Sequence, residues 1–171
     1  MLAEVADEES PDASAIPRIL GASVVVGVLA GLAVIAYLSV EHALQGLLWD
    51  TIPDGLGGTP AWWVFAVLVV GAVGVWLALK LPGHGGHRPL DGLGIDIGPK
   101  QIGSVVAAAL ISLSIGAVVG PEAPLMAIGS AVGGFVAMRS TDPVRKVLML
   151  AGAVAAITMI LGNPMVSAVL V

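Results

Sequence analysis

The sequence predicts an all-α protein that crosses a membrane several times, and its composition and its apolar runs support this prediction. Hydrophobic residues make up 57% of the chain and charged residues only 11%, with a mean hydropathy of +1.01. A soluble domain is about half apolar and about one quarter charged. Because 171 residues cannot bury this much apolar surface in one core, the lipid bilayer must cover much of it.

The apolar runs place the expected helices. They are expected at residues 19–40, 61–79, 102–119, 123–138, 144–161 and 165–171, with a short re-entrant segment near 88–95. A helix needs about 20 residues to cross the hydrocarbon core, so the run at 123–138 is marginal and the run at 165–171 is too short. Residues 16–171 are therefore expected to form one membrane domain with broken or re-entrant helices. Glycine pairs four residues apart recur in it and favour close helix packing: 27 with 31, 116 with 120, and 129 with 133.

Charge patterning predicts the ends and the orientation of the chain. Residues 1–15 are acidic, contain serine and proline, and hold no long apolar run, so we expect a disordered tail there. Lysine and arginine favour the cytoplasmic side of a membrane. They occur in segments 80–100 and 139–146 but not in the polar stretch 41–60, which we interpret as an external loop. The prediction is a multi-pass protein of the cell membrane with a cytoplasmic N-terminus.

Several function classes are disfavoured. The chain has no cysteine, which rules out disulfides, iron–sulfur clusters and thiolate metal sites. It has no basic patch for nucleic acid. His84 and His87 lack the carboxylate or thiolate partners of usual metal sites, so neither a metal nor a cofactor is expected. An enzyme is not expected either, because the membrane segments offer Glu122 and scattered serines but no base beside a nucleophile. A lipid-phosphate phosphatase remains the less favoured alternative.

Glu122 is the most informative residue. It lies in Gly-Pro-Glu-Ala-Pro at residues 120–124, between two apolar runs, and it is the only acidic residue from 101 to 138. Proline after glycine is typical of the first turn of a helix, where unpaired N–H groups carry partial positive charge. We expect free donors at Glu122, Ala123, Leu125 and Met126. A carboxylate there either is simply hydrated at the interface or marks an ion pathway.

A second candidate is the glycine-rich stretch 81–93. Three of the four residues from 83 to 86 are glycine, with His84 between them, and such backbone can approach a ligand closely. We interpret His84, Gly85 and Gly86 as residues that line an ion entrance.

Three segments together resemble the CLC family of chloride channels and proton/anion exchangers. Residues 83–87 (Gly-His-Gly-Gly-His) stand where that family has Gly-Ser-Gly-Ile-Pro. Residues 120–124 stand where it has Gly-Arg/Lys-Glu-Gly-Pro, and residues 148–171, with Asn163-Pro164, look like the helix pair that follows. The likeness covers about residues 83–171, while the first two helices agree only in kind.

This resemblance implies the first inverted repeat of the CLC fold and a specific site. Glu122 matches the family's gating glutamate, and His84 matches the serine that coordinates the central anion. The ligand would be chloride or a similar anion, with protons in the exchangers, and the full-length protein would be a homodimer. The departures are histidine for serine at 84, proline for arginine at 121 and alanine for glycine at 123.

The resemblance ends before the second repeat, which leaves two interpretations. The chain is expected to be the N-terminal part of an anion channel or proton-coupled anion transporter. The alternative is a truncated, inactive remnant of such a protein.

Overall fold

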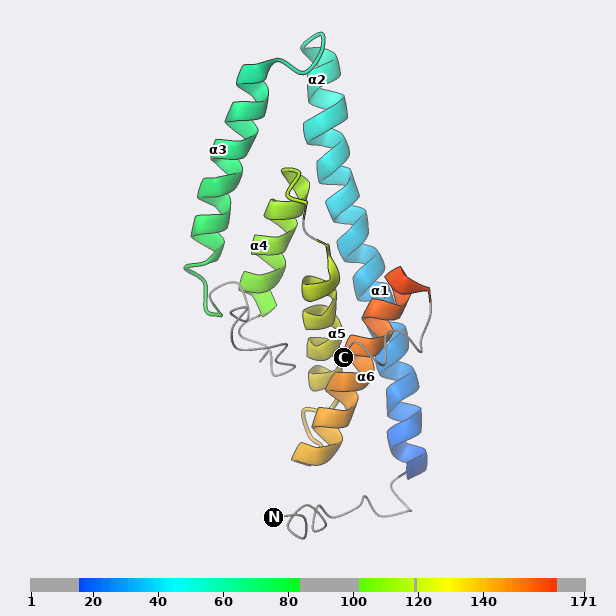
Figure 1. Cartoon of the computed structure of the whole chain (residues 1–171). Helices are drawn as coiled ribbons and strands as arrows, with labels where there is room; N and C mark the ends of the chain where they lie inside the picture. The colour runs from blue at the N-terminus through cyan, green and yellow to red at the C-terminus, as the bar shows by residue number, and fades with distance from the viewer. Residues whose placement is uncertain (1–15, 84–101, 119, 163–171) are drawn as a thin grey trace, which may run out of the picture.

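The computed structural model describes residues 16–83, 102–118 and 120–162, and these residues form an all-α fold (Figure 1). The elements follow one another as α1 (Ile16–Gly46), η1 (Leu47–Thr51), α2 (Ile52–Gly55), α3 (Ala61–Ala78), α4 (Ile102–Ser114), α5 (Glu122–Val136) and α6 (Asp142–Leu161). The predicted acidic tail, the re-entrant segment near 88–95 and the run at 165–171 lie outside the described residues.

Within these residues, three helical segments are long and apolar enough to cross a membrane. They are Ile16–Gly55, Ala61–Ala78 and Asp142–Leu161, whereas α4 and α5 are shorter apolar helices. A helix of 13 or 15 residues extends only about 20 Å at 1.5 Å per residue, which is less than the hydrocarbon core. The chain is therefore an all-α polytopic membrane protein that combines long and short helices.

The first helical segment is longer than the sequence suggested. The stretch 41–60 was expected to be an external loop, but helix continues through Gly55 by way of the single π-helical turn η1. Pro53, which has no N–H, stands in the first turn of α2 directly after this π-helical turn. The chain turns only at Gly57 and Gly58, whose φ angles of 78° and 135° suit glycine.

The antiparallel pair α5 and α6 has the closest backbone approach in the described fold (Figure 1). A Cβ atom added at Gly129 would meet the carbonyl of Gly152, and one added at Gly133 would meet the carbonyl of Leu148. Only glycine lets the two backbones lie this close. The pair 129 and 133 therefore does form a packing face.

The other two glycine pairs differ from each other. Gly27 and Gly31 of α1 face α6 at ordinary contact distance, with 4.0 Å from an added Cβ at Gly27 to the Cβ of Ala155. Gly116 and Gly120 do not share a helix, because α4 ends at Ser114 and α5 begins at Glu122. The expectation that this pair forms a helix-packing face is wrong.

The central core lies where α1, α4, α5 and α6 meet. Its buried members are Val34, Tyr37, Leu113, Leu125, Ile128 and Ala156. Leu125 belongs to the first turn of α5, so this core fixes the start of α5 against the middle of α1. By contrast, α3 keeps large apolar side chains such as Phe65 and Val70 exposed, as expected of a helix that faces lipid.

Candidate functional site

The candidate site is the break between α4 and α5. Helix α4 ends at Ser114, five residues before the expected end of its apolar run, because Gly116 adopts a φ of 93°. The N–H of Ala117 donates to the carbonyl of Ser112, and the N–H of Gly116 donates to that of Leu113, each at 3.0 Å. This bond pair is the Schellman motif that ends helices at a left-handed glycine. The apolar run continues past the turn, so hydropathy alone gave no sign of the break.

The start of α5 has fewer free donors than predicted. Pro121 is the N-terminal cap residue, and the N–H of Leu125 donates to its carbonyl at 3.1 Å. By helical geometry the N–H of Met126 pairs with the carbonyl of Glu122. Leu125 and Met126 therefore do not offer free N–H groups, which corrects that expectation. Because Pro124 has no N–H, the donors left by the helix are those of Glu122 and Ala123.

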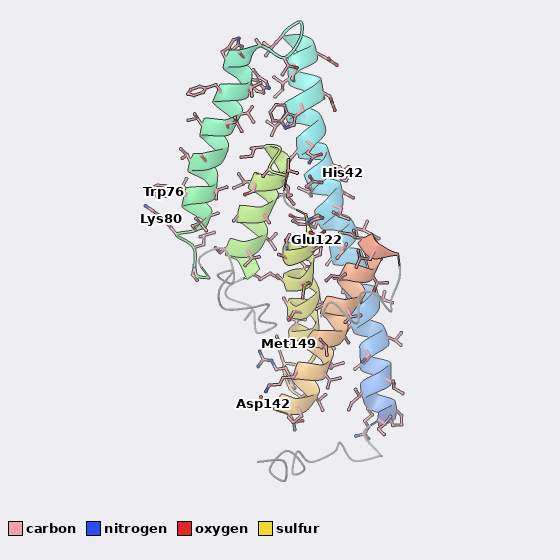
Figure 2. The ribbon with its side chains drawn as sticks, in the orientation of Figure 1. His42, Trp76, Lys80, Glu122, Asp142 and Met149 are labelled. Atoms are coloured by element: carbon pink, nitrogen blue, oxygen red, sulfur yellow. The ribbon has the colours of Figure 1, made fainter. Side chains whose placement is uncertain are left out.

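The Glu122 side chain turns back toward the beginning of its own helix. Its carboxylate lies against Gly120, so a Cβ atom added at Gly120 would collide with it. The residue is exposed in this chain, at the upper end of α5 in Figure 2. A carboxylate in this position interacts favourably with the positive end of the helix dipole.

Helix α1 and the turn η1 supply a stripe of polar and aromatic side chains to this break. Tyr37, Glu41, Gln45 and Trp49 are spaced four residues apart and so lie on one side of the helical segment. The indole N–H of Trp49 donates to the carbonyl of Ser114 at 2.9 Å, and the amide of Gln45 donates to that of Leu113 at 3.3 Å. These bonds satisfy carbonyls at the end of α4 and hold the break against α1.

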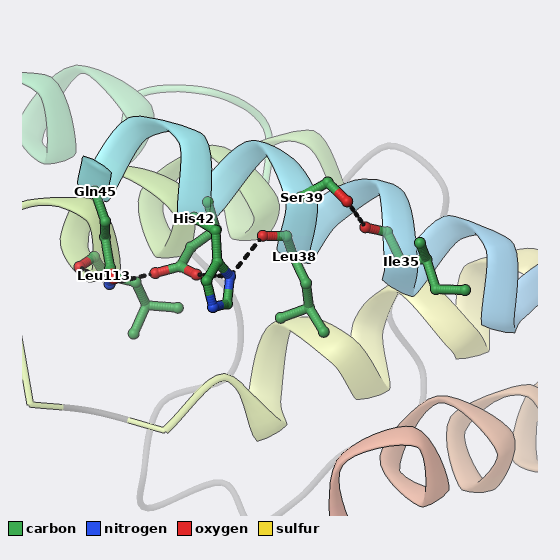
Figure 3. Close-up of polar contacts among 7 residues, drawn as sticks. Ile35, Leu38, Ser39, His42, Gln45 and Leu113 are labelled. Carbon is green, nitrogen blue, oxygen red and sulfur yellow. Dashed lines mark hydrogen bonds and ion pairs between the residues drawn. The ribbon is translucent and has the colours of Figure 1, made fainter. Parts of the chain in front are cut away.

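Glu41 is the buried acidic residue of this stripe. It is 6% exposed, and its Oε1 atom accepts a hydrogen bond from the amide of Gln45. Its Oε2 atom lies 3.1 Å from Nδ1 of His42. Figure 3 shows the bonds of Gln45 and His42 along α1. Glu41 was not among the predicted site residues because its polar neighbours suggested a loop over residues 41–60, although the four-residue spacing was visible.

Two buried hydroxyl groups accompany the stripe. Within the described residues, neither the Tyr37 hydroxyl nor the Ser114 hydroxyl has a hydrogen-bond partner. Buried hydroxyl groups usually find one, since leaving such a group unpaired costs about 1–3 kcal/mol. Both residues belong to the region where α1 meets the end of α4.

The remaining predicted site residues are only partly placed. His84, Gly85 and Gly86 lie outside the described residues, so the structure does not bring them to Glu122. Ala123 is exposed beside Glu122 in the first turn of α5. In the part of the chain that the structure describes, no group of three or more histidine and acidic side chains is placed to hold a metal ion.

The fold is that of a multi-pass helical membrane protein in which a break separates two short helices, α4 and α5. Its curated relatives include the "Putative ion-transport protein YfeO" of Escherichia coli O139:H28, which is 27% identical over 158 residues. The protein of the same name from Escherichia fergusonii is 26% identical over 157 residues. Both matches cover 86% of this chain but only 37% of the relative.

The chain thus spans well under half the length of these relatives. No protein-family model matches it, and no solved structure does. It is a multi-pass membrane protein whose distant relatives are named for ion transport.

Proposed function

We propose that this chain is the N-terminal part of a CLC-like anion channel or proton-coupled anion transporter, with Glu122 as its gating carboxylate. The observation that carries the proposal is the position of Glu122 at the start of α5, where the apolar run is interrupted and the carboxylate is turned over the helix end. The names of the relatives support ion transport in general. The inference that the transported ion is an anion rests on the electropositive helix start and on the resemblance of residues 120–124 to the CLC motif.

The mechanism follows from the donors at the helix start. The N–H groups of Glu122 and Ala123 have no partner within α5 and carry the partial positive charge of the helix end. An anion bound there would compete with the ionised carboxylate of Glu122 for the same electropositive place. When Glu122 takes up a proton, its carboxyl group loses that attraction and the place becomes available. Anion flux is therefore expected to rise as the pH falls.

The remaining features belong to the same proposal. His84, Gly85 and Gly86 would supply further contacts to a chloride-like anion, and the complete protein would work as a homodimer in the cell membrane with its N-terminus in the cytoplasm. The Ala123 methyl group narrows the approach to the helix start, and proline at 121 removes both a donor and a positive side chain from it.

The test replaces the carboxylate in the complete gene product and measures anion efflux from proteoliposomes. For Glu122→Gln we expect flux that varies less than about twofold between about pH 4 and about pH 7, because the exchangeable proton of the carboxyl group is gone. The unmodified protein should show a clear rise toward acid pH. The matched control is Asp142→Asn, because Asp142 is also an exposed carboxylate in the first turn of a helix.

Two outcomes would contradict the proposal in different ways. If the complete gene product carries no anion at any pH, anion conduction is rejected and the inactive remnant is favoured. If Glu122→Gln keeps the pH dependence of the unmodified protein, conduction stands but Glu122 is not the gate.

A further inference from the structure

We propose that Glu41 is a second proton-binding carboxyl group of this membrane domain, and that His42 exchanges its proton with the surroundings. The two side chains are neighbours in the sequence but differ sharply in exposure. The side chain of Glu41 is 8% exposed and that of His42 is 77% exposed, with 3.1 Å between Oε2 and Nδ1. The imidazole therefore lies between the buried carboxyl group and the surface of the chain.

The burial of Glu41 requires compensation for its charge. It lies in a helical segment that is apolar and long enough to span a membrane, and ionised groups are costly in such places. Its polar contacts are the amide of Gln45 and the ring of His42, and within the described residues no lysine or arginine forms an ion pair with it. Either an imidazolium at His42 or a proton on Glu41 itself can supply the compensation.

The contacts of His42 indicate which of its two ring nitrogens can take up a proton. Its Nδ1 atom lies 2.9 Å from the carbonyl of Leu38 as well as 3.1 Å from Glu41 (Figure 3). A carbonyl oxygen only accepts, so Nδ1 carries the hydrogen of the neutral ring. The other nitrogen, Nε2, is then the one that can take up a proton.

The exchange can be written so that protons and charges balance. A proton binds at Nε2 and converts the ring to imidazolium. The hydrogen on Nδ1 then moves to Oε2 of Glu41, which leaves a neutral carboxyl group and a neutral ring protonated at Nε2. The reverse steps return the proton to the surroundings, so one route loads and unloads the carboxyl group.

Other charged or titratable groups of the neighbouring elements define the setting. Tyr37 lies one turn before Glu41 on α1, η1 carries Asp50, and α4 contains no titratable residue. Helix α5 contributes Glu122 in its first turn. The charged residues of α6 are in its first turns, and Figure 2 places Asp142 at the end of the molecule away from His42. Among the described residues, His42 is therefore the basic side chain that lies next to Glu41.

The region around Glu41 is also coupled by packing to the start of α5. Tyr37 and Leu125 belong to one buried cluster, and Gln45, which donates to Glu41, also donates to the end of α4. A change of charge at Glu41 therefore occurs close to both the end of α4 and the start of α5. This would link proton binding at Glu41 to the geometry at Glu122, although proton binding itself does not depend on the proposed anion site.

The test is infrared difference spectroscopy of the purified protein during a pH titration, which detects protonated carboxyl groups directly. We expect a carboxyl signal that Glu41→Gln removes and that Glu122→Gln leaves in place. In His42→Gln, which alters an exposed side chain, this signal should change with pH differently from that of the unmodified protein, because the imidazole beside the carboxyl group is lost. Because no anion flux is measured, the result does not depend on the function proposed above.

Ser39→Ala is the matched control for His42→Gln. Ser39 is also exposed on α1 and bonds a backbone carbonyl four residues earlier, that of Ile35, but no contact joins it to Glu41 in the described structure. It should leave the titration unchanged. The proposal is overturned if no carboxyl signal is lost in Glu41→Gln, or if His42→Gln titrates like the unmodified protein. If Glu41→Gln does not fold, the unchanged titration of His42→Gln alone is enough to reject it.

Discussion

Two glutamates of this chain are held in opposite ways. Glu41 is buried and is contacted by the side chains of Gln45 and His42, so its carboxyl group is fixed in place. Glu122 is exposed, and its carboxylate rests against the bare Cα of Gly120. The proposed gate requires a carboxylate that can leave the ion site, and of these two glutamates Glu122 is the exposed one. The contact with Gly120 is then the feature that sets its resting position.

Gly120→Ala should displace the Glu122 carboxylate without unfolding the protein. The added methyl group would collide with the end of a flexible, exposed side chain, which can rotate away at little cost. We expect the anion flux of this variant at about pH 7 to move toward that of Glu122→Gln, with a thermal stability within about 0.5 kcal/mol of the unmodified protein. Flux from proteoliposomes and melting in detergent measure the two quantities.

Gly103→Ala is the control, because an added Cβ there has no atom within 4 Å. It should leave flux unchanged and should keep or slightly raise stability, because alanine has the higher helix propensity. If Gly120→Ala also keeps the unmodified pH dependence of flux, the resting position of Glu122 against Gly120 has no role in gating.

At the scale of elements, α5 and α6 form the tightest pair of the described fold. The backbones meet at Gly129 and Gly152, each of which faces the carbonyl of the other. The first turn of α5 belongs to the same rigid helix, so the pairing with α6 determines where Glu122 is presented. The site therefore depends on a contact between backbones far along α5 from the carboxylate.

Gly152→Ala should destabilise the protein because neither backbone can yield. The added methyl group would meet the Gly129 carbonyl and lie 3.1 Å from Cγ1 of Val26, so the helices would have to move apart. Overpacking of this kind costs about 1–3 kcal/mol. The expected result is a lower melting temperature in detergent. Melting can be monitored by tryptophan fluorescence or by loss of the monodisperse peak in size-exclusion chromatography.

Gly27→Ala is the matched control, because Gly27 lies on α1 where that helix faces α6. The nearest atom to an added Cβ is that of Ala155 at 4.0 Å, so alanine fits, and its higher helix propensity should keep or raise stability. Equal melting temperatures for Gly152→Ala and the unmodified protein would show that the close approach at Gly129 is not needed for the fold.

The elements also show what the sequence could and could not predict. Apolar runs were enough to predict an all-α membrane protein, because an apolar segment in lipid must satisfy its own backbone hydrogen bonds, as a helix does. They failed at residues 41–55, where Glu41 and Asp50 suggested a loop, because contacts from the distant α4 support the polar stripe of this helical segment. They also placed the end of α4 too late, since Gly116 ends the helix inside an apolar run.

At the candidate site, the motif at residues 120–124 predicted a helix start with a carboxylate. It did not predict which backbone N–H groups would be left without a partner. The N–H of Leu125 donates to the carbonyl of Pro121 and is therefore not free. This bond forms because Pro121 is the cap residue of α5, and the sequence does not show which residue caps the helix. Glu41 was predictable in principle from its four-residue spacing to Tyr37 and Gln45. Its burial was not, because it results from the packing of α1 against α4, α5 and α6.

At the scale of the whole molecule, two chain reversals lie at opposite ends of the fold. The turn between α2 and α3 is at one end in Figure 1, and the turn between α5 and α6 is at the other. The first turn carries no lysine or arginine, while Arg139, Arg145 and Lys146 surround the second. The geometry places the two turns at opposite ends, and the distribution of positive charge predicts residues 56–60 outside and residues 137–146 in the cytoplasm.

Single cysteines can test this orientation because the chain has none of its own. Thr59→Cys and Ser140→Cys each place a thiol at an exposed position in one of the two turns. A maleimide that cannot cross membranes should label Thr59→Cys on intact cells and should label Ser140→Cys only after lysis. The reversed pattern would mean that the N-terminus is external. Labelling of both thiols on intact cells would show that α3 to α5 do not carry the chain across the membrane, which would also remove the basis for an ion pathway at the α4–α5 break.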